Sequence, residues 1–90
     1  MPVIENMVII TNKTGLHARP ATLFVQAAAR FQAQIQVRHG EKSANAKSIL
    51  RVLTLGASQG TTLHIRAEGE DAEEAVQALT ELVERQFDEE

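Results

Sequence analysis

A histidine, an arginine and a proline lie close together in residues 14–22, TGLHARPAT. The residues that follow favour a helix, and Gly15 in front of them loosens the chain. Ser, Thr, Asp or Asn usually caps a helix, so a histidine at this junction is an unusual choice. Because proline is tolerated in the first helical turn, Pro20 predicts that His17 lies at or just before the start of a helix.

A histidine at a helix start has the properties of a phosphoryl acceptor. The unpaired backbone N–H groups of Ala18 and Arg19 and the positive end of the helix dipole would point toward the ring. They disfavour the charged imidazolium, so we expect a neutral ring whose lone pair can attack phosphorus. The same groups would then hold the phosphoryl dianion, contributing about 0.3–1 kcal/mol. Arg19 adds a planar cation suited to phosphate oxygens.

Other kinds of site fit the sequence less well. An ordinary surface histidine is the alternative interpretation of His17, and from composition alone it is the more frequent case. His17, His39 and His64 are far apart, no cysteine is present, and no metal-ligand spacing is seen. Neither a local Ser-His-acid arrangement, a pair of catalytic carboxylates nor a Gly-rich nucleotide loop can be recognised. We therefore expect that the chain binds no metal and no cofactor. We also expect that it carries a chemical group and does not itself transform a substrate.

Length and composition narrow the class of protein. The chain has 90 residues, 43% of them hydrophobic, which predicts one domain over residues 1–90. The absence of cysteine fits a reducing, intracellular setting. The first ten residues are neither a signal peptide nor a membrane span, so no membrane insertion is expected. With a net charge of −3 and no Tyr or Trp, the chain is not expected to bind nucleic acid.

Hydrophobic periodicity predicts the elements that position His17. Strands are expected over residues 3–11, 34–38, 41–46 and 61–67, and helices over residues 18–31, 49–55 and from 72 onward. Ser48 can cap the short helix, and Asp71 with Glu74 forms a capping-box-like start for the last one. The strands are apolar on one side only. The order β-α-β-β-α-β-α therefore predicts an α+β open-faced sandwich, a four-stranded antiparallel sheet with three helices on one face.

Two stretches resemble a known family. GLHARPA, residues 15–21, is similar to the active-site signature of the HPr family, the histidine-containing phosphocarrier proteins of the bacterial sugar phosphotransferase system. Residues 47–79, KSILRVLTLGASQGTTLHIRAEGEDAEEAVQAL, resemble the family's second helix, fourth strand and last helix in order and spacing. The resemblance covers residues 3–86, and the two motifs together are highly specific.

This resemblance implies a function. The chain would accept a phosphoryl group from phospho-Enzyme I, which draws it from phosphoenolpyruvate, and pass it to a histidine of Enzyme IIA domains for sugar uptake. It would do so as a cytoplasmic carrier rather than as an enzyme. His17 matches the histidine whose Nδ1 is phosphorylated, and Arg19 matches the assisting arginine. Ile49, Arg51 and Leu53 match positions that contact both partners, although an apolar residue at the position of Leu53 departs from many relatives.

The short second helix also carries more apolar residues than one buried stripe can hold. We expect Leu50 or Val52, and Leu55, to enter the core, and the others to face outward as a partner surface.

Ser48 matches a site that an ATP-dependent HPr kinase/phosphorylase modifies in many bacteria. A plain helix cap explains the same serine, so both interpretations stay open.

Alternative functions follow from the same resemblance. A regulatory binding module that controls an enzyme or a transcriptional regulator is one, but the relative of this kind lacks the active-site histidine. A carrier in a nitrogen-linked or dihydroxyacetone-linked phosphorelay is another. We expect a monomer. The acidic end ERQFDEE, residues 84–90, could fold near Arg19 or extend into solvent, and the second arrangement is expected.

Overall fold

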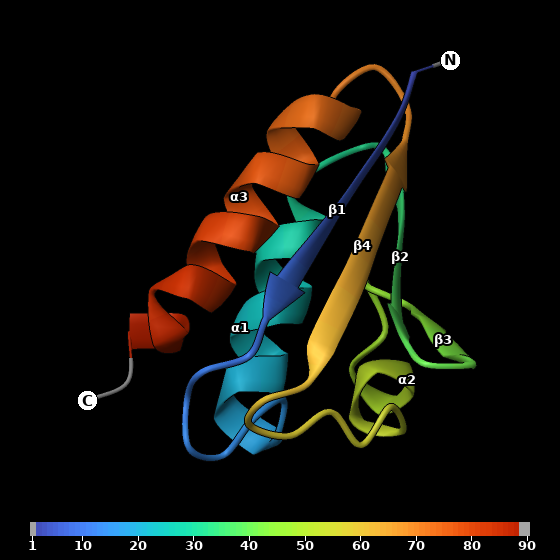
Figure 1. The fold of residues 1–90 in the computed structure, drawn as a ribbon. Helices are drawn as coiled ribbons and strands as arrows, with labels where there is room; N and C mark the ends of the chain where they lie inside the picture. Colours follow the sequence, from blue (N-terminus) through green and yellow to red (C-terminus); the bar gives the residue numbers. More distant parts are fainter. Residues whose placement is uncertain (1, 89–90) are drawn as a thin grey trace.

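The computed structural model describes residues 2–88 of the chain (Figure 1). In these residues the elements follow the predicted order and end in a short additional turn, η1. They are β1 (Val3–Ile9), α1 (Ala18–Ala29), β2 (Gln34–His39), β3 (Lys42–Asn45), α2 (Ile49–Leu53), β4 (Thr62–Glu68), α3 (Ala72–Glu84) and η1 (Gln86–Asp88). The predicted boundaries differ from the observed ones by one or two residues, as is usual at frayed ends.

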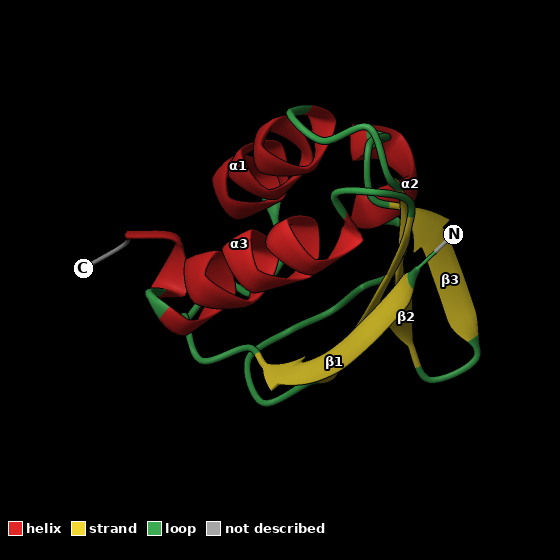
Figure 2. Cartoon of the chain, turned by 90° about the horizontal axis from the view of Figure 1, so that it is seen from above, coloured by secondary structure: helices red, strands yellow, loops and turns green. Residues whose placement is uncertain are grey.

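The four strands form one antiparallel sheet in the order β1-β4-β2-β3. In β4 the side chains of Leu63, Ile65 and Ala67 are buried beneath the helices, and those of the residues between them lie on the other face. Figure 2 shows α1 and α3 on one side of the sheet, with the opposite side left uncovered. The predicted open-faced sandwich is confirmed.

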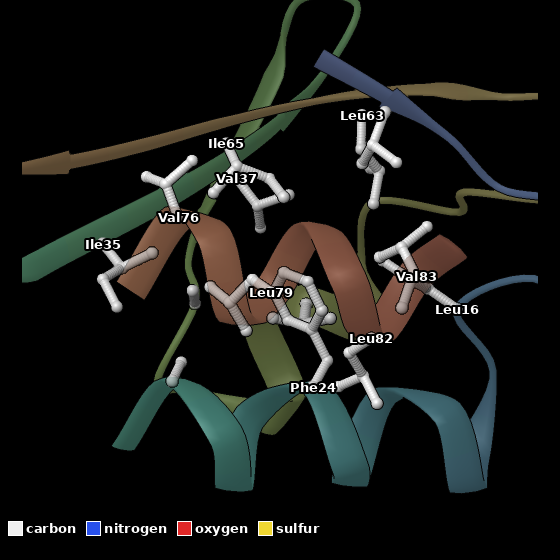
Figure 3. Packing of buried hydrophobic residues seen from close by; sticks show 14 of the residues in the cluster. Leu16, Phe24, Ile35, Val37, Leu63, Ile65, Val76, Leu79, Leu82 and Val83 are labelled. Atoms are coloured by element: carbon white, nitrogen blue, oxygen red, sulfur yellow. The ribbon is translucent and has the colours of Figure 1, made fainter. Parts of the chain in front are cut away.

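The core lies between this sheet and the two long helices (Figure 3). Phe24 of α1 is fully buried beside Leu79 of α3. The apolar face of α3 is buried throughout, and it consists of Ala72, Ala75, Val76, Leu79, Leu82 and Val83. Sheet and helices therefore share one apolar layer, which fixes where α1 begins relative to the strands.

The start of α3 differs from the predicted capping box. Asp71 occupies the N-cap position, but its side chain makes no capping bond. Its two carboxylate oxygens instead accept hydrogen bonds from the backbone N–H groups of Gln32 and Ala33, each at 2.8 Å. These bonds, that of Gln32 first, lower the pKa of Asp71 below its ordinary value. Asp71 thus ties the turn after α1 to the start of α3, a long-range role that the local pattern did not reveal.

The C-terminal segment also differs from the expectation. It was expected to extend into solvent, yet up to Asp88 it folds back on the protein. Phe87 is buried and packs with α1 and α3 in the common core. Gln86, Phe87 and Asp88 have φ angles of 58°, 55° and 59°, a left-handed conformation that is uncommon for residues other than glycine. Residues 89 and 90 lie outside the described part of the chain.

Candidate functional site

His17 is the N-cap residue of α1, as predicted. Its backbone is extended, with φ −104° and ψ −170°, and its carbonyl oxygen accepts the first helical hydrogen bond, from the N–H of Ala21 at 2.8 Å. The side chain is exposed and makes no capping bond to the helix. Since the imidazole does not cap the helix, both the ring and the helix start are accessible from solvent.

The first turn of α1 offers backbone donors to an anion. Among the described residues, no hydrogen bond is formed by the N–H groups of Ala18 and Arg19. Pro20, the third residue of the helix, has no N–H to offer. Two free donors and the positive end of a 12-residue helix therefore lie directly beside His17.

The chain before His17 is held tightly by the segment that precedes β4. Gly15 has a φ of +65°, and a Cβ atom there would lie 2.5 Å from the carbonyl oxygen of Ala57 and 2.6 Å from Cα of Ser58. The next residue, Leu16, is buried and donates its N–H to the same carbonyl of Ala57 at 2.9 Å. The expectation that Gly15 loosens the chain is wrong, because this glycine permits a close contact between two loops.

Two amide side chains complete this anchoring. The buried Asn12 donates from Nδ2 to the carbonyl oxygen of Gly15 at 3.0 Å. Gln59 donates from Nε2 to the carbonyl oxygen of Thr11, also at 3.0 Å. Asn12 was not among the residues predicted to build the site. The only available signal was an Asn in a turn-forming stretch, which many loops share.

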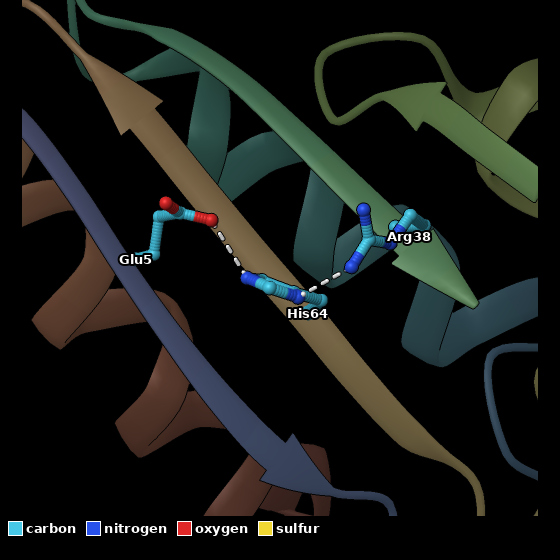
Figure 4. Close-up of polar contacts among 3 residues, drawn as sticks. All are labelled: Glu5, Arg38 and His64. Atoms are coloured by element: carbon cyan, nitrogen blue, oxygen red, sulfur yellow. Dashed lines mark hydrogen bonds and ion pairs between the residues drawn. The ribbon is translucent and has the colours of Figure 1, made fainter. Parts of the chain in front are cut away.

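The three histidines differ in their partners. Figure 4 shows His64 on the uncovered face of the sheet, between Arg38 and Glu5. A guanidinium only donates, so Nδ1 of His64 accepts from Nη2 of Arg38 at 2.9 Å, and Nε2–H donates to Oε1 of Glu5 at 2.8 Å. Both ring nitrogens of His64 are therefore engaged within the sheet.

His39 is also bound. Its Nδ1 lies 3.1 Å from the carbonyl oxygen of Leu55, and since a carbonyl only accepts, Nδ1 carries the proton. Within residues 2–88, the ring of His17 alone among the three forms no hydrogen bond or ion pair. Of the three imidazoles, that of His17 is the one with both nitrogens available.

Arg19 borders a hollow beside the helix start. The hollow has a volume of about 730 Å³ and is lined by Thr11, Asn12, Lys13, Thr14, Arg19, Gln59, Gln86 and Asp88. Arg19 and Lys13 bring positive charge to it, whereas Asp88 of the terminal turn brings a carboxylate. His17 lies outside this hollow, on the exposed surface at the helix start. The terminal turn therefore reaches the surroundings of Arg19, whereas extension into solvent was the expected arrangement.

Helix α2 packs beside α1, and Ser48 is its N-cap residue (Figure 1). The hydroxyl oxygen of Ser48 accepts a hydrogen bond from the N–H of Arg51 at 3.4 Å, so the predicted cap is present. The side chains of Val52 and Leu55 are buried, as expected. Ile49 and Leu53 are exposed, and so is Leu50, with 74% of its surface accessible. We call Ile49, Leu50, Arg51 and Leu53 the α2 patch.

No group of three or more His, Cys, Asp or Glu side chains in residues 2–88 is arranged to hold a metal ion. None of the helices there combines the length and the apolar character that a bilayer span requires.

Comparison with known proteins agrees with this architecture. Residues 4–85 match the family model described as the PTS HPr component phosphorylation site. The phosphocarrier protein HPr of Pseudomonas aeruginosa is 47% identical over 90 residues, with 99% of this chain and 98% of the relative covered. The crystal structure of HPr-C-His from Thermoanaerobacter tengcongensis superposes with a TM-score of 0.94 at 53% identity, covering 97% of this chain and 98% of that one. A structure of an HPr dimer from the same organism matches with a TM-score of 0.78 at 54% identity, covering 91% and 94%.

These matches identify the chain as a phosphocarrier protein. It belongs to the HPr family, which serves the phosphoenolpyruvate-dependent sugar phosphotransferase system. The resemblance noted in the sequence is thereby confirmed over nearly its full length.

Proposed function

We propose that His17 is the residue that carries the phosphoryl group. The observation that supports this most directly is that its ring is exposed and without a partner, next to the free N–H groups of Ala18 and Arg19. The lone pair of one ring nitrogen attacks phosphorus, an N–P bond forms, and the bond from phosphorus to the donor histidine of phospho-Enzyme I breaks. The donor nitrogen keeps that electron pair. The backbone donors then face the oxygens of the new phosphoramidate.

Arg19 assists this transfer. Its guanidinium is permanently charged and its side chain is exposed two residues after the acceptor. An exposed cation on the same helix turn as the acceptor can approach the phosphoryl oxygens as negative charge develops during transfer. The carboxylate of Asp88 lines the same hollow but is paired with Arg85 at 3.3 Å.

Enzyme I and Enzyme IIA domains are the proposed partners, and the α2 patch is the surface that they contact. Its three apolar side chains are exposed on a helix that packs beside α1. Arg51 within the patch can meet acidic residues of a partner. We expect Leu50→Glu to weaken binding to Enzyme I, whereas Met7→Glu, at another highly exposed apolar position, this one on the sheet, should leave it unchanged. Equal effects of the two variants would place the docking surface elsewhere.

Ser48 is a proposed regulatory phosphorylation site for an HPr kinase/phosphorylase. A phosphate there would add roughly −1.5 to −2 charge beside the α2 patch and would repel an anionic partner. We expect Ser48→Asp to slow loading of His17 by Enzyme I, with Ser48→Asn as a capping control that adds no charge. If both variants are loaded as fast as the parent protein, Ser48 serves only as the cap of α2.

The remaining features of the proposal follow from this role. The 90 residues act as one phosphocarrier domain that is consumed and regenerated stoichiometrically, so the chain is not itself an enzyme. We propose that it works as a monomer, since His17 and the α2 patch belong to one chain and the proposed transfer uses no residue of a second copy. We place it in the cytoplasm, where phosphoenolpyruvate is made, and under Ser48 control it would also contact a transcriptional regulator.

Incubation with Enzyme I and phosphoenolpyruvate tests the proposal. Intact mass should rise by one phosphoryl group, and the adduct should be lost in acid and kept in base, as expected for a phosphoramidate. His17→Ala should abolish the increase, with His39→Ala as the control that retains it. If His17→Ala is still phosphorylated, the assignment of the acceptor is wrong.

A further inference from the structure

Strand β1 lies at an edge of the sheet, and its outer side has no partner strand within residues 2–88. Toward β4, the N–H of Ile10 donates to the carbonyl of Thr61, and the carbonyl of Pro2 accepts from Gly69. In an antiparallel pair, successive residues direct their backbone groups to opposite sides. The N–H and C=O groups of the odd-numbered residues 3–9 therefore point outward, as an unpaired template for another strand.

One side of this edge is apolar. Val3, Met7 and Ile9 all project to the uncovered face of the sheet, in register with residues of β4 that are exposed or half-buried. Met7 is 64% exposed and Ile9 56%. Edge strands usually carry charges or proline to discourage pairing, whereas here Glu5 alone interrupts the stripe. Its carboxylate is bound to His64 and is therefore turned inward across the sheet.

The other side of the edge is an acidic groove between β1 and α3. It has a volume of about 380 Å³, with Ile4 and Val76 among its apolar lining. Three exposed glutamates of α3, Glu73, Glu81 and Glu84, also line it. No ion pair joins any of these three to a cation among the described residues.

We propose that this edge binds an extended partner segment in which basic and apolar residues alternate, as a fifth strand beside β1. Side chains of a strand alternate between the two faces of a sheet, so one set would cover Val3, Met7 and Ile9. The other set would enter the groove, where Lys or Arg heads meet the glutamates and their methylene stems cover the apolar lining. The edge lies across the sheet from α2, so the segment could bind while the α2 patch is occupied (Figure 1).

A second copy of this chain fits the edge less well. Antiparallel pairing of two β1 strands would place both α3 helices on the same face of the joined sheet. The two sets of Glu73, Glu81 and Glu84 would then face one another, and like charges across an interface disfavour association. The same acidic groups that repel a second copy attract a basic segment.

Titration of the 15N-labelled protein with a synthetic Lys-Val-Lys-Ile-type peptide of about seven residues, the length of β1, tests this proposal. We expect saturable amide shifts in β1 and in residues 73–84. A peptide with Glu in place of Lys should not bind. Nor should one that is N-methylated at the residues facing β1, because it cannot donate to the strand edge.

Charge reversal separates the groove from the general charge of the protein. Glu73→Lys/Glu84→Lys should weaken peptide binding by about 2- to 30-fold, the range for two exposed ion pairs. Glu74→Lys/Glu70→Lys makes the same change of charge outside the groove lining and should have a smaller effect. Equal weakening by both variants, undiminished binding of the N-methylated peptide, or shifts confined to other elements would overturn the proposal. Self-association that Met7→Lys abolishes would assign the edge to a second copy instead.

Discussion

Replacing Gly15 with alanine measures how strongly the contact between the two loops holds His17 in place. The backbone at Gly15 is left-handed, which costs an L-residue about 1–2 kcal/mol. The new Cβ would also lie 2.5 Å from the carbonyl oxygen of Ala57, so backbone must move. Overpacking of this kind costs about 1–3 kcal/mol more. We therefore expect Gly15→Ala to lower the free energy of unfolding by about 2–5 kcal/mol.

Gly40→Ala is the matched control. Gly40 has nearly the same φ, +61°, but no atom lies within 4 Å of the position of its Cβ. Only the backbone cost of about 1–2 kcal/mol should remain there. Urea unfolding of the parent and both variants, with unchanged m-values, gives the comparison. If Gly15→Ala is no more destabilising than Gly40→Ala, the close contact at Ala57 does not hold the loop as described.

Three further predictions concern the tail, the turn after α1 and the site. Phe87→Ala should lower stability by about 3 kcal/mol in thermal unfolding because a buried aromatic ring is lost; an unchanged midpoint would mean that the tail is not packed. The lowered pKa of Asp71 stabilises the fold above the ordinary pKa of a carboxyl, and this contribution is lost as pH falls through the lowered value. The difference in melting temperature between the parent and Asp71→Asn should therefore shrink toward acid pH, and a constant difference would contradict the role of its charge. Arg19→Ala should leave the free energy of unfolding within about 0.5 kcal/mol of the parent value but should slow phosphoryl transfer in rapid-quench measurements. An unaltered rate of transfer would mean that Arg19 does not assist the reaction.

Patterns within a single element were predictable from the sequence. The alternation around Ile65 identified the buried face of β4, and the spacing around Leu79 identified that of α3. The position of Pro20 correctly placed His17 at the start of α1. In each case the signal and the structure depend on the same few neighbouring residues, and burial of one face decides the outcome.

Contacts between distant segments were not predictable in this way. Asp71 lies at a position that is typical of a helix cap. Its carboxylate instead accepts hydrogen bonds from two backbone N–H groups of the turn after α1, which is close in space but distant in sequence. Gly15 resembles any loop glycine until the segment at Ala57 is placed against it. Phe87 follows a charged stretch that favours solvent, yet the core accepts its ring. Each outcome depends on tertiary packing that composition and periodicity do not encode.

The central claim is that the phosphoryl group is attached to His17 and held by the first turn of α1. NMR of the 15N-labelled protein, recorded before and after phosphorylation by Enzyme I and phosphoenolpyruvate, tests both parts at once. We expect the ring signals of His17 alone among the three histidines to change as for N-phosphorylation. We also expect the largest amide shifts at Ala18 and Arg19. Phosphorylation signals at His39 or His64, or a modified His17 with unshifted amides at Ala18 and Arg19, would contradict this assignment.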